Sequence, residues 1–313
     1  MSSKRGLLIS GGGSWGAFGG GTLARINSDY DTIVGVSTGS LLAPLIALKE
    51  WEVLKEGYTS LNNDNVFDKC WYKPMPFTKR GSLNKLAIII TLMLGQKTIC
   101  TSNALRNTIS NFFPEKYFDE LRKQNKEILV SAQNYAQIPS KIHYFNSLDI
   151  EYEEFKDWIW CSTNFPFFTT LVKKSWQSND GNFHIGQWSD GGITDLIGID
   201  QLMMKRFKEI DIILHKERVI EKLEGNIINT LMENVNTNIN VMQYDIEFEY
   251  FYERIKRLNK QGAKVTVYWL PRKLSVNSMV FNKEEMSAWW EEGYNTAFDV
   301  NRTEVFMPIK RSM

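Results

Sequence analysis

Short apolar runs separated by glycine-rich turns and helical segments mark the first part of the chain. Residues 7–9 are apolar, three consecutive glycines follow, and apolar side chains then recur at near-helical spacing, which predicts a strand, a loop and a helix. The plan then repeats: residues 32–34 form a β-branched run, 35–39 a tight turn, and 41–48 a segment that is apolar nearly all round. Such a helix is expected to be buried, and Pro44 is expected to end or bend its first turns because the ring removes a backbone donor.

Later segments continue the alternation of strands and helices. We expect strands over residues 127–132, 142–146, 210–214 and 264–269, and helices over 152–160, 217–260 and 283–297. This order predicts one domain of the α/β class, with a mostly parallel central sheet and helices on both faces. The loops at the carboxyl ends of the strands build the site in such a sheet, and both glycine-rich turns lie at such ends.

One segment of the chain breaks this regularity. Residues 51–118 are rich in Asn, Lys and aromatic side chains, and we interpret them as an insertion or lid over a core of about residues 5–215. A helical and strand extension of about residues 217–313 would follow.

The longest apolar run, 86–94, is far shorter than the roughly 20 residues that span a bilayer. It is therefore expected to be a buried helix or a lid beside the site, and both readings stay open.

The charge, cysteine and tryptophan content indicate which partners and which cell compartment to expect. The chain has 37 Lys and Arg against 36 Asp and Glu, so it lacks the net field that gathers nucleic acid, and nucleic acid is not an expected partner. Three widely spaced cysteines, Cys70, Cys100 and Cys161, are expected to be ordinary thiols. Together with an N-terminus that lacks the pattern of a signal peptide, they favour the cytoplasm. Some of the ten tryptophans could contact a membrane surface peripherally, although most are expected in the core.

Ser37 is the candidate nucleophile. It stands in Gly35-Val36-Ser37-Thr38-Gly39 between the predicted second strand and its helix. A serine on such a turn presents its hydroxyl above the sheet, and the following helix directs its positive dipole at it. Gly35 and Gly39 are needed because the backbones approach so closely that a Cβ would collide.

The first glycine-rich loop is the candidate oxyanion hole. Gly11, Gly12 and Gly13 at a helix start expose backbone N–H groups where the anion of an acyl-transfer intermediate would form. Further glycines in the next helix each cost about 1 kcal/mol relative to alanine, which predicts close packing there; they are Gly16, Gly19, Gly20 and Gly21. The competing interpretation is a dinucleotide phosphate cradle, but its acidic residue would fall near residues 29–31, ahead of the next strand instead of at its end.

The chain resembles the patatin-like phospholipases in three motifs that occur in the family's order. Gly11 to Gly16 matches the glycine-rich oxyanion loop, the Ser37 pentapeptide matches G-x-S-x-G, and Asp190-Gly191-Gly192 matches the aspartate motif. The resemblance covers most of residues 5–215 and implies a three-layer α/β/α fold. It also implies a serine acyl hydrolase for lipid or other acyl esters, in which Asp190 accepts the Ser37 proton directly, with no metal or other cofactor.

The sequence departs from the family at two positions of these motifs. Trp15 stands where the family usually has arginine or lysine, so the loop lacks the customary cation beside its amides. Upstream of the aspartate, Ser162 and Pro166 match the family's A-S-x-A-x-P pattern. Asn164 in that pattern replaces a small apolar residue, and we expect this change to affect packing only.

Two further interpretations stay open beside a Ser-Asp hydrolase. The absence of the loop cation would fit a lipid-binding protein that keeps the fold but has lost turnover. A Ser-His-Asp esterase would need an imidazole after the acid in the chain. Among His143, His184 and His215, only His215 follows Asp190, and it ends a predicted strand.

Overall fold

A computed structural model describes most of the chain. The described residues are 4–68, 98–136, 139–166, 168–177, 181–193, 195, 197–218, 248–275 and 277–308. The apolar run 86–94, for which a buried helix and a lid were both open, lies outside them, as does most of 217–260.

Nine described strands form one sheet in the order β5-β6-β3-β2-β1-β7-β8-β9, with β4 paired to β3. The pairings among β3, β2, β1, β7 and β8 are parallel, and the outer strands join antiparallel. The predicted parallel centre is therefore confirmed. The strands are β1 (Arg5–Ile9), β2 (Thr32–Gly35), β3 (Glu127–Asn134), β4 (Lys141–Asn146), β5 (Val172–Gln177), β6 (Phe183–Asp190), β7 (Glu209–Glu217), β8 (Lys264–Leu270) and β9 (Thr303–Phe306).

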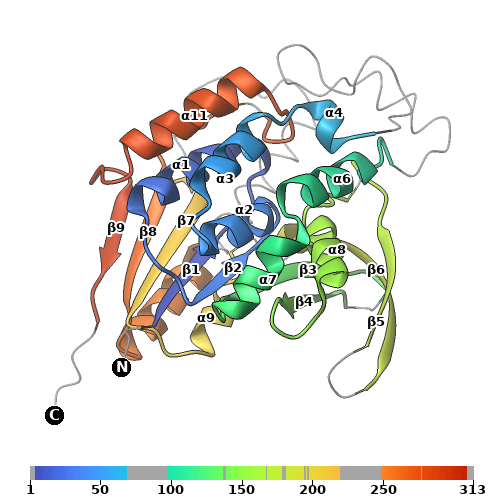
Figure 1. Cartoon of the computed structure of the whole chain (residues 1–313). Coiled ribbons are helices and arrows are strands. Elements are labelled where there is room, and N and C mark those ends of the chain that lie inside the picture. The colour runs from blue at the N-terminus through green and yellow to red at the C-terminus, as the bar shows by residue number, and fades with distance from the viewer. Residues whose placement is uncertain are drawn as a thin grey trace, which may run out of the picture.

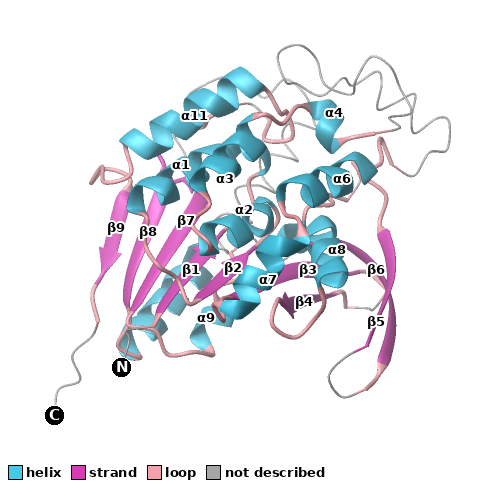
Figure 2. Cartoon of the chain, in the orientation of Figure 1, coloured by secondary structure: helices cyan, strands magenta, loops and turns pink. Residues whose placement is uncertain are grey.

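Helices cover both faces of the sheet, as the alternation of elements predicts (Figures 1 and 2). The α-helices with complete bounds are α1 (Gly16–Ile26), α2 (Thr38–Ala47), α3 (Trp51–Thr59), α4 (Asn63–Val66), α6 (Asn103–Phe112), α7 (Glu115–Lys123), α8 (Tyr152–Ser162), α9 (Asp200–Met203) and α11 (Lys283–Asn295). On one face, α1, α2, α3, α6, α7, α8 and α11 share a core. On the other, α9 and helical residues 248–260 pack on a second core. The fold is a three-layer α/β/α arrangement.

Glycines in α1 allow α11 to pack against it at close range. A Cβ on Gly20 would overlap the Trp290 ring, and one on Gly21 would overlap the Trp290 carbonyl. The contact is reciprocal, since a Cβ on Gly293 of α11 would overlap the Phe18 carbonyl. The predicted close packing after the first loop is confirmed, and its partner is a helix near the end of the chain.

Pro44 does not end its helix, contrary to one of the two expectations, because α2 continues to Ala47 with Pro44 inside it. A proline in a helix interior costs about 3 kcal/mol. Burial of large aliphatic side chains contributes about 1.5–3 kcal/mol each, and Leu42, Leu45 and Ile46 of this helix are all buried. Core packing therefore outweighs the local penalty.

Residues 51–68 and 98–118 are more regular than their composition predicts. They form α3, α4, α6 and the start of α7, and Leu54, Tyr58 and Ile109 join the main core. The described parts of this segment are thus built into the helical layer. The cysteine expectation is wrong at Cys100, which is disulfide-bonded, while Cys161 is a buried free thiol.

Candidate active site

Ser37 occupies the sharp turn between β2 and α2. Its backbone has φ +52° and ψ −120°, a conformation that residues other than glycine rarely adopt. A Cβ on Gly35 would overlap the Gly39 backbone, and one on Gly39 would overlap the Ile9 carbonyl. Both glycines are therefore required by close approach, as predicted. Ser37 is half-buried, whereas its neighbours Val36 and Thr38 are fully buried.

A serine pair holds the strained turn in place. The backbone N–H of Ser37 donates to the Oγ of Ser162 at 3.0 Å, and the hydroxyls of Ser162 and Ser40 hydrogen-bond at 2.8 Å. The Ser40 hydroxyl in turn donates to the Gly35 carbonyl at 3.0 Å. Ser162, at the end of α8, thus fixes the backbone orientation of the turn. The sequence shows that Ser162 matches the family's A-S-x-A-x-P pattern, but it did not predict the hydrogen bond between Ser162 and the turn.

We expect Ser162→Ala to lower the free energy of unfolding by about 1–3 kcal/mol, because the substitution leaves the Ser37 N–H without its acceptor. Urea denaturation measures this loss. In an ester hydrolysis assay the variant should lose kcat more than it changes KM, since the turn that presents Ser37 is loosened. An unchanged kcat with reduced stability would show that Ser162 is structural only.

The sheet register brings the aspartate to the serine. Residues 129–134 of β3 pair with β4 along one edge, so β2 and β6 must share the other edge. Strand β2 ends at Gly35, opposite Val130, and β6 arrives from the opposite direction to end at Asp190, opposite Ala132. The two strands therefore meet end to end, two residues apart along β3, and Ser37 and Asp190 emerge at the meeting point.

Asp190 is buried and hydrogen-bonded to Ser37. Its side chain is 4% exposed, it accepts a side-chain hydrogen bond from Ser37, and it accepts the Gly192 N–H at 2.7 Å. Burial raises the pKa of Asp190 to about 7, although both hydrogen bonds act to lower it. A Cβ on Gly191 would overlap the Ser131 hydroxyl, so this glycine is needed for the turn after the aspartate.

Asn164 supports Asp190 in a way that the sequence interpretation missed. Its carbonyl accepts the Asp190 N–H at 3.0 Å. Its buried side chain accepts a hydrogen bond from the Ser102 hydroxyl at 2.5 Å and donates to the Thr170 carbonyl at 2.6 Å. The expectation that Asn164 changes packing only is therefore incomplete, because the amide ties the segment before β5 to α6. No motif signals these partners, which lie on separate elements.

The glycine loop lies beside the start of α2. Thr38 Oγ1 donates to the Gly13 carbonyl at 2.8 Å, and the Tyr58 hydroxyl donates to the same carbonyl. On the other side, the Ser14 N–H donates to the Ser278 carbonyl at 2.8 Å. A Cβ on Gly16 would overlap the Tyr58 hydroxyl, so that glycine is needed for the contact.

The backbone N–H groups of the glycine loop have no acceptor in the described part of the chain. No described residue accepts a hydrogen bond from the N–H groups of Gly11, Gly12 or Gly13, and Gly12 and Gly13 are half-buried instead of fully enclosed. Gly13 has φ +52°, which favours glycine. The loop is therefore clamped through its carbonyl while its amides stay available.

Trp15 and the acidic residues before β2 each have structural partners. The Trp15 indole N–H donates to the Ser275 hydroxyl at 2.9 Å, so it points to the C-terminal part of the chain. Asp31 accepts the Arg5 N–H at 2.7 Å, and Asp29 pairs with Lys126 at 2.6 Å. These carboxylates lie at the amino end of β2, at the opposite end of the sheet from the glycine loop. They therefore cannot serve as the acidic residue that a dinucleotide site needs beside that loop.

His215 packs against Gly12 of the glycine loop, and its hydrogen bonds go to Ser10 instead of Ser37 or Asp190. Its Nδ1 hydrogen-bonds the Ser10 carbonyl at 2.9 Å, and its N–H donates to the Ser10 hydroxyl at 2.9 Å. Burial lowers its pKa to about 4, so the ring is neutral at pH 7. Its Nε2 has no hydrogen-bond partner among the described residues and lies against α1, where a Cβ on Gly19 would overlap it.

An apolar cavity of about 50 Å³ lies along α2. Leu41, one turn after Ser37, lines it together with Tyr58, whose hydroxyl reaches the glycine loop. The remaining walls come from α3, α6 and α8. Among the described residues, no three His, Cys, Asp or Glu side chains gather as metal ligands would.

Comparisons with protein families and with known proteins show which family the chain is similar to. No curated protein matches the chain. Among solved structures, VipD from Legionella pneumophila has 12% sequence identity and a TM-score of 0.44, and the alignment covers 98% of this chain and 68% of that one; this likeness is too distant to carry an inference. The model of the family described as patatin-like phospholipase matches residues 7–203, a range that contains the glycine loop, Ser37 and Asp190. The chain therefore belongs to the patatin-like phospholipase family.

Proposed function

We propose that this protein is a lipid acyl hydrolase, of phospholipase or lysophospholipase type, that uses Ser37 as nucleophile and Asp190 as base. The hydrogen bond between a half-buried serine on a strained turn and a buried carboxylate carries the proposal. Family membership supports lipid esters as substrates. The amides of Gly11, Gly12 and Gly13 would stabilise the oxyanion.

The reaction would proceed by two acyl transfers. Ser37 Oγ attacks the ester carbonyl carbon while its proton passes to Asp190, and the carbonyl oxygen becomes an anion facing the glycine amides. Collapse of this intermediate breaks the ester bond, and the leaving alcohol takes the proton from Asp190. Water then attacks the acyl-enzyme and gives its proton to Asp190, which returns it to Ser37 as the fatty acid leaves.

A carboxylate can serve as this base because of its environment. An ordinary aspartate, with a pKa of about 3.9, is a weak base at neutral pH. The pKa of about 7 in the buried site places Asp190 where general bases are efficient. The proposed proton transfer needs no intervening histidine, because the Ser37 hydroxyl hydrogen-bonds the Asp190 carboxylate.

We predict that kcat/KM for an uncharged ester rises with pH and levels off above about pH 7, because Asp190 must be ionised to accept the serine proton. A pH-rate profile on a water-soluble ester measures this. His215→Asn keeps a donor for the Ser10 carbonyl and should show the same apparent pKa. Loss of hydrolysis in folded His215→Asn would instead favour the Ser-His-Asp interpretation.

A lipid-binding protein without turnover remains the second candidate, and Trp15 is the observation that favours it. The loop lacks the family's usual cation, and the indole is turned to Ser275. The two candidates differ in one assay. A purified protein that binds phosphatidylcholine vesicles but releases no fatty acid, lysophospholipid or alcohol from a panel of esters would support the binding role.

A further inference from the structure

The hairpin formed by β5 and β6 projects beyond the end of the sheet where the parallel strands terminate and Ser37 lies. We call this end the catalytic edge. Strand β3 ends at Asn134, opposite Trp188, so the first residues of β6 continue past it. Because β3 is parallel to β2, this edge is the one at which Ser37 lies. Figure 1 shows the hairpin extending outward from the body of the molecule at the right. The strand that delivers Asp190 therefore begins on an external arm.

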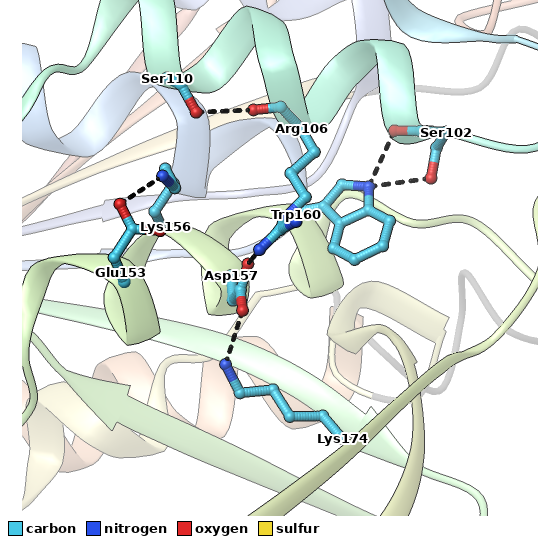
Figure 3. A network of polar contacts seen from close by, with 8 residues as sticks. All are labelled: Ser102, Arg106, Ser110, Glu153, Lys156, Asp157, Trp160 and Lys174. Atoms are coloured by element: carbon cyan, nitrogen blue, oxygen red, sulfur yellow. Dashed lines mark hydrogen bonds and ion pairs between the residues drawn. The ribbon is translucent and has the colours of Figure 1, made fainter.

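One face of the hairpin is fixed to the protein. Lys174 of β5 pairs with Asp157 of α8 at 3.0 Å and lies over the Trp158 ring. Asp157 also accepts a hydrogen bond from Arg106 of α6 at 2.8 Å (Figure 3). Trp188 of β6 is fully buried. The base of the hairpin is therefore held rigidly, and its orientation is set by two helices.

The opposite face carries large apolar side chains that touch solvent. Phe183 is 76% exposed and Ile185 82% exposed. They are two residues apart in a strand, so both point to the same face. Their paired residues on β5 are Gln177 and Ser175, which are exposed and uncharged. Two bulky hydrocarbon side chains thus extend from a rigid arm into water.

Charge on this face fits a lipid surface. No described residue of the face is acidic, and its charged member is Lys173, opposite Gln187. Lys173 has no ion-pair partner among the described residues. At about 3.3 Å per residue, Lys173 lies about 13 Å behind Phe183. The Phe183 and Ile185 side chains would reach the acyl boundary, about 5–10 Å deep, while the Lys173 ammonium stays at the level of the lipid phosphates.

We propose that this face, defined by Lys173, Ser175, Gln177, Phe183, Ile185 and Gln187, docks the protein on a phospholipid surface and presents the catalytic edge to it. The inference rests on the proposed function for its lipid substrate. The described helices include none that is long and apolar enough to cross a bilayer. The proposed contact is interfacial, with Phe183 and Ile185 as the inserted side chains.

Vesicle flotation tests the proposal in the full-length chain. The parent carries Ser37→Ala, so that vesicles of phosphatidylcholine are not consumed. Phe183→Ser with Ile185→Ser should lower vesicle binding at least about tenfold, because insertion of both side chains is lost. The matched control is Phe298→Ser with Val300→Ser, which removes two similarly exposed apolar side chains, 63% and 81% exposed, near β9. It should change binding by less than about twofold.

The outcomes of the vesicle assay decide the proposal. Unchanged binding of the hairpin variant, equal losses in the control, or a parent that does not bind vesicles would overturn it. A parent that dimerises through these residues, with a monomeric hairpin variant in sedimentation, would make the face a protein interface instead. Hydrolysis of a water-soluble ester by the hairpin variant with Ser37 intact should stay unchanged, which confirms folding. Absence of ester hydrolysis in the wild type would defeat the proposed function without deciding the vesicle result.

Discussion

Replacing Ser37 by alanine is expected to lower ester hydrolysis by at least about 10⁴-fold, because loss of a nucleophilic serine removes the covalent route and leaves only binding and oxyanion stabilisation. The alanine occupies the same strained turn and keeps the backbone N–H that donates to Ser162. Binding of substrate should therefore survive. Initial rates with a chromogenic ester, at matched concentrations of folded protein, measure the loss.

Ser189→Ala provides the matched control for this variant. Ser189 is fully buried and adjacent to Asp190, and its hydroxyl has no hydrogen-bond partner in the part of the chain that the structure describes. Removing that hydroxyl should change kcat/KM by less than about threefold. A Ser37→Ala protein that keeps more than a small fraction of wild-type hydrolysis would exclude Ser37 as nucleophile.

Asp190→Asn is expected to lower kcat by at least about 10³-fold, since an amide cannot accept the proton of Ser37 and general-base catalysis alone contributes 10²–10⁴-fold. The pH-rate profile of the residual activity should lose its inflection near pH 7. Asp195→Asn is the control, because Asp195 follows closely in the chain but bonds Tyr144 and Gly198 instead of Ser37. Equal losses in both variants would point to a folding defect.

The same substitution should stabilise the fold above neutral pH. The pKa of Asp190 is about 7 in the folded protein and about 3.9 in an unfolded chain. Between these values the folded state holds a proton that the unfolded state has lost, so the stability contributed by this group falls as pH rises from about 4 to about 7. Asp190→Asn removes that dependence. We expect it to be more stable than wild type at pH 8 by up to about 4 kcal/mol, with no such gain at pH 4.

Parallel unfolding curves of wild type and Asp190→Asn at pH 4, 6 and 8 measure this effect. The other titrating groups cancel in the difference. A difference that grows between pH 4 and 8 supports a buried carboxylate whose ionised form is costly. Such a cost is a signature of a group retained for chemistry at the expense of stability.

Local patterns were sufficient to predict the central elements. Residues 7–9 are apolar and residues 32–34 are β-branched, as expected for parallel strands buried on both faces, and β1 and β2 are found there. The need for Gly35 and Gly39 was predicted from the close approach of backbones that the structure shows. The α2 helix was predicted as buried, but the passage of Pro44 through it depends on tertiary packing that no local rule includes.

Elements with mixed patterns were missed. The β5–β6 hairpin alternates polar, apolar and glycine residues because one face packs on α8 and the other meets solvent. Neither strand has the continuous apolar run of a buried strand. The pairing of its end with Ala132 of β3 depends on contacts far apart in the sequence. The direct meeting of Asp190 and Ser37 was therefore an implication of the family resemblance, not of the pattern.

The C-terminal part of the chain contributes to the site without any motif. Ser278 holds the glycine loop through its carbonyl, Ser275 accepts the Trp15 indole, and α11 packs on α1. Ser275, Ser278 and α11 lie beyond the range that matches the family model. Backbone carbonyls and single hydroxyls leave no recognisable sequence signal, so this support could be found only in three dimensions.

The central claim is that Asp190 directly activates Ser37, and the rate of covalent labelling by a fluorophosphonate tests it most directly. In wild type, peptide mapping should place the adduct on Ser37, and at equal folded fraction Asp190→Asn should label at least about a hundredfold more slowly. His215→Asn should label close to the wild-type rate. An adduct on another residue, or an Asp190→Asn protein that labels as fast as wild type, would contradict the account.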